Sequence, residues 1–71
     1  MQKLIGFLYK RQGKMLLLDQ STGEVKKLVD CSTHDSLKAT YKDANGLENP
    51  VTLWGIPGEK NEFYVEFAHT I

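Results

Sequence analysis

The chain has 71 residues, of which 41% are hydrophobic and 25% charged, and nine basic side chains balance nine acidic ones. A chain of this size forms one domain, residues 1–71, with a small core, because only about 60% of its surface is buried on folding. The composition excludes a disordered chain, and the neutral charge differs from the positive excess of most nucleic-acid-binding domains. Cys31 is the only cysteine, and no apolar run is long enough for a signal peptide or a membrane span. We therefore expect a cytoplasmic protein.

The two signs of charge are unevenly distributed along the chain. Residues 1–27 carry six basic and two acidic side chains, which gives +4, and residues 28–71 carry three and seven, which gives −4. Such asymmetry is typical of an anion-binding face or of a dipolar surface that fits a second copy of itself. Strands from the two halves that interleave would instead mix the signs, so the sequence leaves both outcomes open.

Residues 3–10 form the first apolar run. Ile5, Phe7 and Tyr9 share one face, and leucines occupy the other. Apolar residues on both faces are typical of a strand that is covered on both sides. Gly6 lies in the middle of the run, where glycine often marks a bulge or a sharp bend at a barrel corner.

The next two runs extend this pattern into a meander. Residues 11–14 are a short polar connection in which Gly13 can take a positive φ, and residues 15–20 resume as a second strand, which predicts a hairpin. Residues 21–24 form another turn before a third strand at 24–30. Three consecutive antiparallel strands are therefore expected in the first 30 residues.

Residues 31–46 fit two different structures. As a helix at about 33–44, the segment places Leu37, Tyr41 and Ala44 on one face, and Asn45 with Gly46 ends it. As a strand, its apolar and polar residues alternate, and the same Asn–Gly pair makes a hairpin turn. We favour the strand because the rest of the chain is strand-like.

The last third of the chain predicts a β-hairpin. Strands at residues 51–56 and 62–71 flank a five-residue connection at 57–61 that contains Pro57 and Gly58. Pro50 favours an extended conformation at the residue before it. From Phe63 onward every odd position is apolar except His69, which we expect to be partly buried at the end of the sheet.

These elements predict an all-β fold of five to six short strands, with one short helix at about 33–44 as the other possibility for that segment. Turn residues recur about every 8 to 12 positions, which is typical of a small sandwich or barrel. We expect a small antiparallel barrel or a strongly bent sheet, either SH3-like or OB-like.

No arrangement of residues predicts catalysis, a metal or a cofactor. Cys31 and His34 have the spacing of half a zinc site, but His69 is the only further donor of that kind. His34, Asp35 and Ser36 are the residue types of a hydrolytic triad, yet adjacent side chains cannot usually face one another as a triad requires. We therefore expect a protein that is not an enzyme, with no catalytic residue, no metal ligand and no cofactor.

The favoured hypothesis is a protein-binding module of the inhibitor or adaptor type. In the strand at 51–56, either Trp54 and Ile56 or Val51 and Leu53 must point away from the core. Exposed tryptophan and tyrosine are frequent binding hot spots. We therefore expect the surface of the 51–67 hairpin to bind another protein, or a second copy of the chain as a homo-oligomer, through Trp54, Ile56 and Tyr64.

The alternative hypothesis is binding of single-stranded nucleic acid or a nucleotide-like anion. Barrel proteins that bind single strands combine a positive groove with aromatic side chains on which bases stack. The turns at residues 10–14 and 26–27 could supply such a groove beside an aromatic side chain. The candidate residues are Tyr9, Lys10, Arg11, Lys14, Lys26 and Lys27.

Overall fold

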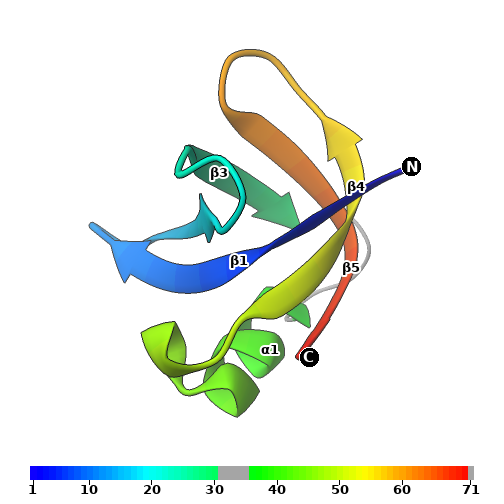
Figure 1. The fold of residues 1–71 in the computed structure, drawn as a ribbon. Coiled ribbons are helices and arrows are strands. Elements are labelled where there is room, and N and C mark those ends of the chain that lie inside the picture. Colours follow the sequence, from blue (N-terminus) through cyan, green and yellow to red (C-terminus); the bar gives the residue numbers. More distant parts are fainter. Residues whose placement is uncertain (31–35, 71) are drawn as a thin grey trace.

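Five strands, one α-helix and one turn of 3-10 helix make up the computed structural model, which describes residues 1–30 and 36–70 (Figure 1). The strands close into a barrel in the order β1-β2-β3-β5-β4, which confirms the predicted all-β class. The elements are β1 (Gln2–Arg11), β2 (Lys14–Asp19), β3 (Val25–Asp30), α1 (Ser36–Ala44), η1 (Gly46–Glu48), β4 (Val51–Pro57) and β5 (Glu62–Thr70).

The strand order is OB-like rather than SH3-like. β3 and β5 pair in parallel, while every other neighbouring pair in the barrel is antiparallel. A parallel pair needs a long connection, and here that connection contains α1 and β4. A five-stranded Greek-key barrel of this kind is the OB architecture.

Gly6 is the residue at which β1 changes partners. Residues 2–6 pair with β4 and residues 6–11 pair with β2, so Gly6 lies opposite both Val51 and Asp19. A Cβ atom at this position would overlap the carbonyl oxygen of Leu18. Gly6 therefore lies at the point where β1 passes from β4 to β2, and the close approach of β2 leaves no room for a side chain there.

The β1–β2 hairpin also follows the sequence prediction. Gln12 and Gly13 connect the strands with φ angles of 54° and 76°. Two consecutive residues with positive φ are typical of a type I′ turn, whose twist matches that of the strands. Gly13 adopts this conformation without steric cost, whereas Gln12 does not.

The core is formed by side chains that point into the barrel from all five strands and from α1. Leu8 pairs with Leu17 across β1 and β2, and Leu28 lies beside Phe63 across β3 and β5. Figure 1 shows α1 at one end of the barrel and the β4–β5 turn at the other. The buried apolar residues are Leu8, Leu17, Leu28, Leu37, Ala44, Val51, Leu53, Phe63 and Val65.

The favoured strand in the 31–46 segment is wrong, because residues 36–44 form α1. Leu37 and Ala44 are buried, and Tyr41 packs against the core. These three residues are spaced so that they share one face of the helix, and this apolar face covers one end of the barrel. The carboxylate of Asp30 accepts a hydrogen bond from the Leu37 amide at 3.3 Å. Asn45, with φ of 59°, ends the helix in the left-handed conformation instead of starting a hairpin.

The β4–β5 hairpin is present, but its alternation changes in the middle of β5. Gly55 lies opposite Val65 and Trp54 lies opposite Phe67, so Glu66 is an extra residue in a β-bulge. After the bulge, each residue of β5 points to the face opposite the one that the sequence alternation predicts. Phe67 therefore points outward and is 49% exposed, although its odd position predicted the same face as Phe63.

The two ends of β4 match the turn predictions in part. Asn49, which precedes Pro50, is extended as expected, with φ of −125° and ψ of 138°. The connection to β5 is one residue shorter than predicted, because Pro57 still belongs to β4. Lys60 rather than Gly58 takes the positive φ, at 54°.

Candidate binding surfaces

The outward side of β4 and β5 carries a group of apolar and aromatic side chains. Val51 and Leu53 are fully buried, so the alternate residues Trp54 and Ile56 point outward. Tyr64 lies opposite Ile56, and the bulge adds two residues from the end of β5 to the same side. We call this surface the aromatic face and define it as Trp54, Ile56, Tyr64, Phe67 and His69.

Three rings of the aromatic face lie in a row. The ring centroids of Trp54 and Phe67 are 6.0 Å apart with an interplanar angle of 29°, and those of Phe67 and His69 are 6.5 Å apart with an angle of 19°. Lys3 continues the row on β1, with its ammonium 5.6 Å from the centroid of Trp54. Adjacent strands thus hold the rings at fixed positions.

The aromatic face is accessible to a partner. The exposed fractions are 54% for Ile56, 49% for Phe67 and 38% for Tyr64. His69 is exposed rather than partly buried as predicted, and its Nδ1 lies 3.0 Å from the carbonyl oxygen of Thr70. The structure thus brings together the three predicted partner-binding residues Trp54, Ile56 and Tyr64.

Sequence reasoning missed Phe67 and His69 as surface residues. The alternation of β5 continues without a break through Glu66 in the sequence, so no local signal marks the extra residue. The glycine opposite the bulge is the one available hint. A Cβ atom at Gly55 would overlap the carbonyl oxygen of Tyr64, and glycine inside a strand often indicates such an irregularity.

A second surface covers the outward side of β1, β2 and β3. Tyr9 lies opposite Leu16, and Leu16 lies opposite Lys27, so these residues form a row across three strands. Arg11 pairs with Lys14 at the end of the β1–β2 hairpin. Five of the six predicted anion-binding residues thus belong to this hairpin or to the same outward row: Tyr9, Lys10, Arg11, Lys14 and Lys27.

Lys10 has a partner in the helix. Its ammonium lies 5.4 Å from the centroid of the Tyr41 ring on α1. The end of β1 and the helix are therefore in contact through a cation–π pair. This contact places the basic hairpin near the end of the barrel that α1 closes.

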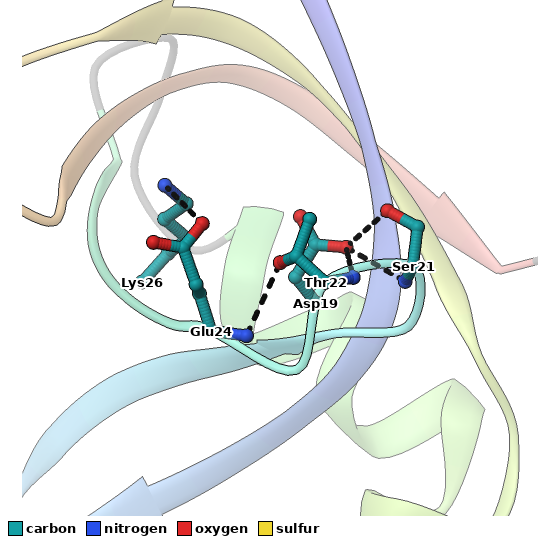
Figure 2. A network of polar contacts seen from close by, with 5 residues as sticks. All are labelled: Asp19, Ser21, Thr22, Glu24 and Lys26. Atoms are coloured by element: carbon teal, nitrogen blue, oxygen red, sulfur yellow. Dashed lines mark hydrogen bonds and ion pairs between the residues drawn. The ribbon is translucent and has the colours of Figure 1, made fainter.

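Lys26 is separated from the other basic residues. It lies opposite Leu17, which points into the barrel, so it faces away from Lys27. Its ammonium lies 3.9 Å from the carboxylate of Glu24 (Figure 2). The predicted grouping of Lys26 with Lys27 is therefore wrong, because consecutive strand residues point to opposite faces.

A groove lies between strands β2 and β3 on one side and the β4–β5 turn on the other. Its cavity volume is about 560 Å³. Leu16 and Val25 contribute apolar surface, while the turn contributes charged and amide groups. We call this cavity the groove and define it as Leu16, Val25, Lys27 and residues 59–62.

The turn between β2 and β3 is organised by the buried carboxylate of Asp19 (Figure 2). Its Oδ1 accepts hydrogen bonds from the Ser21 amide and hydroxyl, each at 2.8 Å, and from the Thr22 amide at 3.3 Å. Burial alone would raise the pKa of Asp19, but the bonds from Ser21 and Thr22 and the charge of Lys26 lower it below 3.8. Asp19 is thus a structural residue that remains ionised.

The residues weighed for catalysis and for zinc contribute no described site. Cys31, His34 and Asp35 lie outside the described residues. Within residues 1–30 and 36–70, histidine, cysteine and acidic side chains nowhere gather in threes as a metal ion requires. The described part of the chain also contains no helix that is long and apolar enough to cross a membrane.

Comparison with known proteins gives no family for this chain. Its sequence matches no family model and no curated protein, and no solved structure matches it.

Proposed function

We propose that the protein is a non-catalytic protein-binding module that acts through the aromatic face. The observation that carries this proposal is the exposure of Ile56, Tyr64 and Phe67 on one side of one hairpin. If each side chain has about 200 Å² of surface, the three together expose roughly 300 Å². The largest apolar patch on a typical monomer covers about 300–600 Å² and is often functional.

The pairing of the strands restricts how a partner can bind. Over Val51–Gly55, β4 is paired with β1 on one side and with β5 on the other. A partner cannot add a strand at this position, because the backbone groups already have partners. Recognition must use the side chains, and the pre-formed row of rings provides area with little loss of side-chain entropy.

We infer that such a module works as an inhibitor or adaptor in the cytoplasm. It covers a surface of another protein, or of a second copy of itself in a homo-oligomer. An apolar contact that excludes water from the centre of the interface would supply most of the affinity, and Lys3 and His69 would lie at its rim.

Charge introduced into the aromatic face tests this proposal. We expect Ile56→Asp with Phe67→Asp to abolish both retention of protein partners on the immobilised chain and any self-association seen by light scattering. Leu18→Asp is the matched control, because Leu18 is 37% exposed on β2, which is not a neighbour of β4 or β5 in the barrel. Equal retention and equal molar mass for the wild type and both variants would refute the proposal.

The second candidate is an anion-binding function of the β1–β2 hairpin. The row of Tyr9, Leu16 and Lys27 favours it, since the outward side of these strands is where OB-folds bind oligonucleotides. Lys10, Arg11 and Lys14 add positive charge beside that row. The affinity for an oligonucleotide should fall steeply between about 50 and 200 mM salt, and an affinity that ignores salt would exclude this function.

A further inference from the structure

β4 is the middle strand of the surface that carries the aromatic face. It lies between β1 and β5 in the barrel, and its Trp54 lies opposite Lys3 on one side and Phe67 on the other. The ammonium of Lys3 lies 5.6 Å from the centroid of the Trp54 ring, so both side chains are on the outward side. A line across the three strands therefore runs from a cation through two aromatic rings.

Glu66 places a carboxylate at the other end of this line. It is the extra residue of the bulge, directly after the buried Val65 and directly before the exposed Phe67. Because consecutive strand residues point to opposite faces, the side chain of Glu66 points outward. Among the residues that the structure describes, Glu66 forms no salt bridge. The surface thus has an ammonium on one outer strand and an unpaired carboxylate on the other.

This arrangement is complementary to a second copy of itself. A two-fold axis that runs along β4, in the plane between two facing sheets, exchanges the two outer strands. Lys3 of each copy then faces Glu66 and Phe67 of the other. Trp54 and Ile56 lie near the axis and face their own counterparts. Two contacts between opposite charges therefore flank an apolar centre.

We propose that the partner of the aromatic face is a second copy of the chain, in a symmetric dimer whose sheets pack face to face about this axis. The inference rests on the proposed function, because it uses the same surface and names its partner. Sheets packed in this way lie about 10 Å apart, with strand directions within about 30° of each other. The net charge of zero means that two copies do not repel each other as whole molecules.

The size of the surface indicates a reversible dimer. The three side chains that expose roughly 300 Å² on each copy would bury roughly 600 Å² in total. Trp54, His69 and the two charged residues add to this area, but stable interfaces bury about 1,200–2,000 Å². We therefore expect a dissociation constant between about 10 µM and 1 mM.

Trp54 reports directly on the centre of the proposed dimer. It is the only tryptophan of the chain, and the second copy would remove its ring from water. We expect its fluorescence emission to shift to shorter wavelength between about 1 µM and 1 mM protein, with the same midpoint as the molar mass from light scattering. An emission that stays constant while the molar mass doubles would place the contact elsewhere and overturn the proposal.

Charge reversal tests the pairing of the outer strands. Lys3→Glu and Glu66→Lys should each weaken dimerisation by about tenfold, because each replaces two contacts between opposite charges with two between like charges. An equimolar mixture of the two variants should restore the affinity, because both contacts between unlike copies again join opposite charges. Lys42→Glu and Asp43→Lys, both at exposed positions on α1, are the matched control pair and should have no effect, alone or mixed.

The outcomes separate this inference from the proposed function. A chain that remains monomeric at about 1 mM, charge reversals without effect, or a mixture that restores nothing would each overturn the second copy as the partner. The proposed function would survive these results if Ile56→Asp with Phe67→Asp still abolished retention of a different protein. A dimer that this double variant leaves intact would overturn the inference, and equal retention as well would overturn the proposed function.

Discussion

Phe67 lies across from Trp54 on the outside of the barrel, with 6.0 Å between the ring centroids, because Glu66 is an extra residue in β5. Without this bulge, Phe67 would share the inward face of Phe63 and Val65, and Trp54 would have no aromatic neighbour on β5. One inserted residue thus creates the aromatic face on which the proposed function depends.

The two phenylalanines of β5 should respond differently to truncation. Phe63 is 1% exposed and belongs to the core, so Phe63→Ala should lower the free energy of unfolding by about 3–5 kcal/mol. Phe67 is half exposed, so Phe67→Ala should lower it by less than about 1 kcal/mol. Urea unfolding measures both values. Equal losses would show that the two rings share one environment, which would contradict a bulge at Glu66.

Substitution of Gly6 tests the crossing of β1 over the barrel. Gly6→Ala forces a methyl group onto the carbonyl oxygen of Leu18 and should cost about 1–3 kcal/mol or more. Gly23→Ala is the comparison, because no atom lies within 4 Å of a Cβ at Gly23 and only its φ of 78° opposes the change. Thermal unfolding should therefore rank Gly6→Ala as the more harmful substitution, and the reverse order would contradict the predicted clash.

The carboxylate of Asp19 should make stability depend on pH in the acid range. The folded pKa of Asp19 is lowered, so its stabilisation is fully present above its ordinary pKa of 3.8 and is lost as the pH falls through the lower folded pKa. Asp19→Asn removes the charge-assisted acceptor and should cost about 1–3 kcal/mol at pH 7. Unfolding curves at several pH values should show this difference shrink toward low pH. A difference independent of pH would contradict the assigned role.

The β1–β2 turn offers a stabilising substitution. Gln12 has a φ of 54° at the first central position of the turn, where asparagine is preferred. Gln12→Asn should raise the free energy of unfolding by about 0.5–1 kcal/mol, because asparagine tolerates the left-handed conformation better. Chemical denaturation measures the gain in free energy of unfolding. Gln20→Asn, directly after β2, serves as a control outside the β1–β2 turn. A neutral or harmful effect of Gln12→Asn would argue against a type I′ turn.

Local patterns in the sequence determine most of the elements. The glycine of the β1–β2 turn and the effect of Pro50 on Asn49 each depend on neighbouring residues, and both predictions are confirmed. The outward position of Trp54 and Ile56 was one of two outcomes that the alternation of β4 allowed. Local propensity and turn chemistry are sufficient to predict features that involve only residues close together in the sequence.

Tertiary structure decides what local patterns leave open. Residues 36–44 have spacings that suit a strand and a helix alike, and they are helical because Leu37 and Ala44 close one end of the barrel. The bulge at Glu66 and the parallel contact of β3 with β5 arise from barrel closure, which joins residues distant in sequence. Burial against distant strands outweighs local preference in each case, so the aromatic face and the groove exist only in the folded barrel.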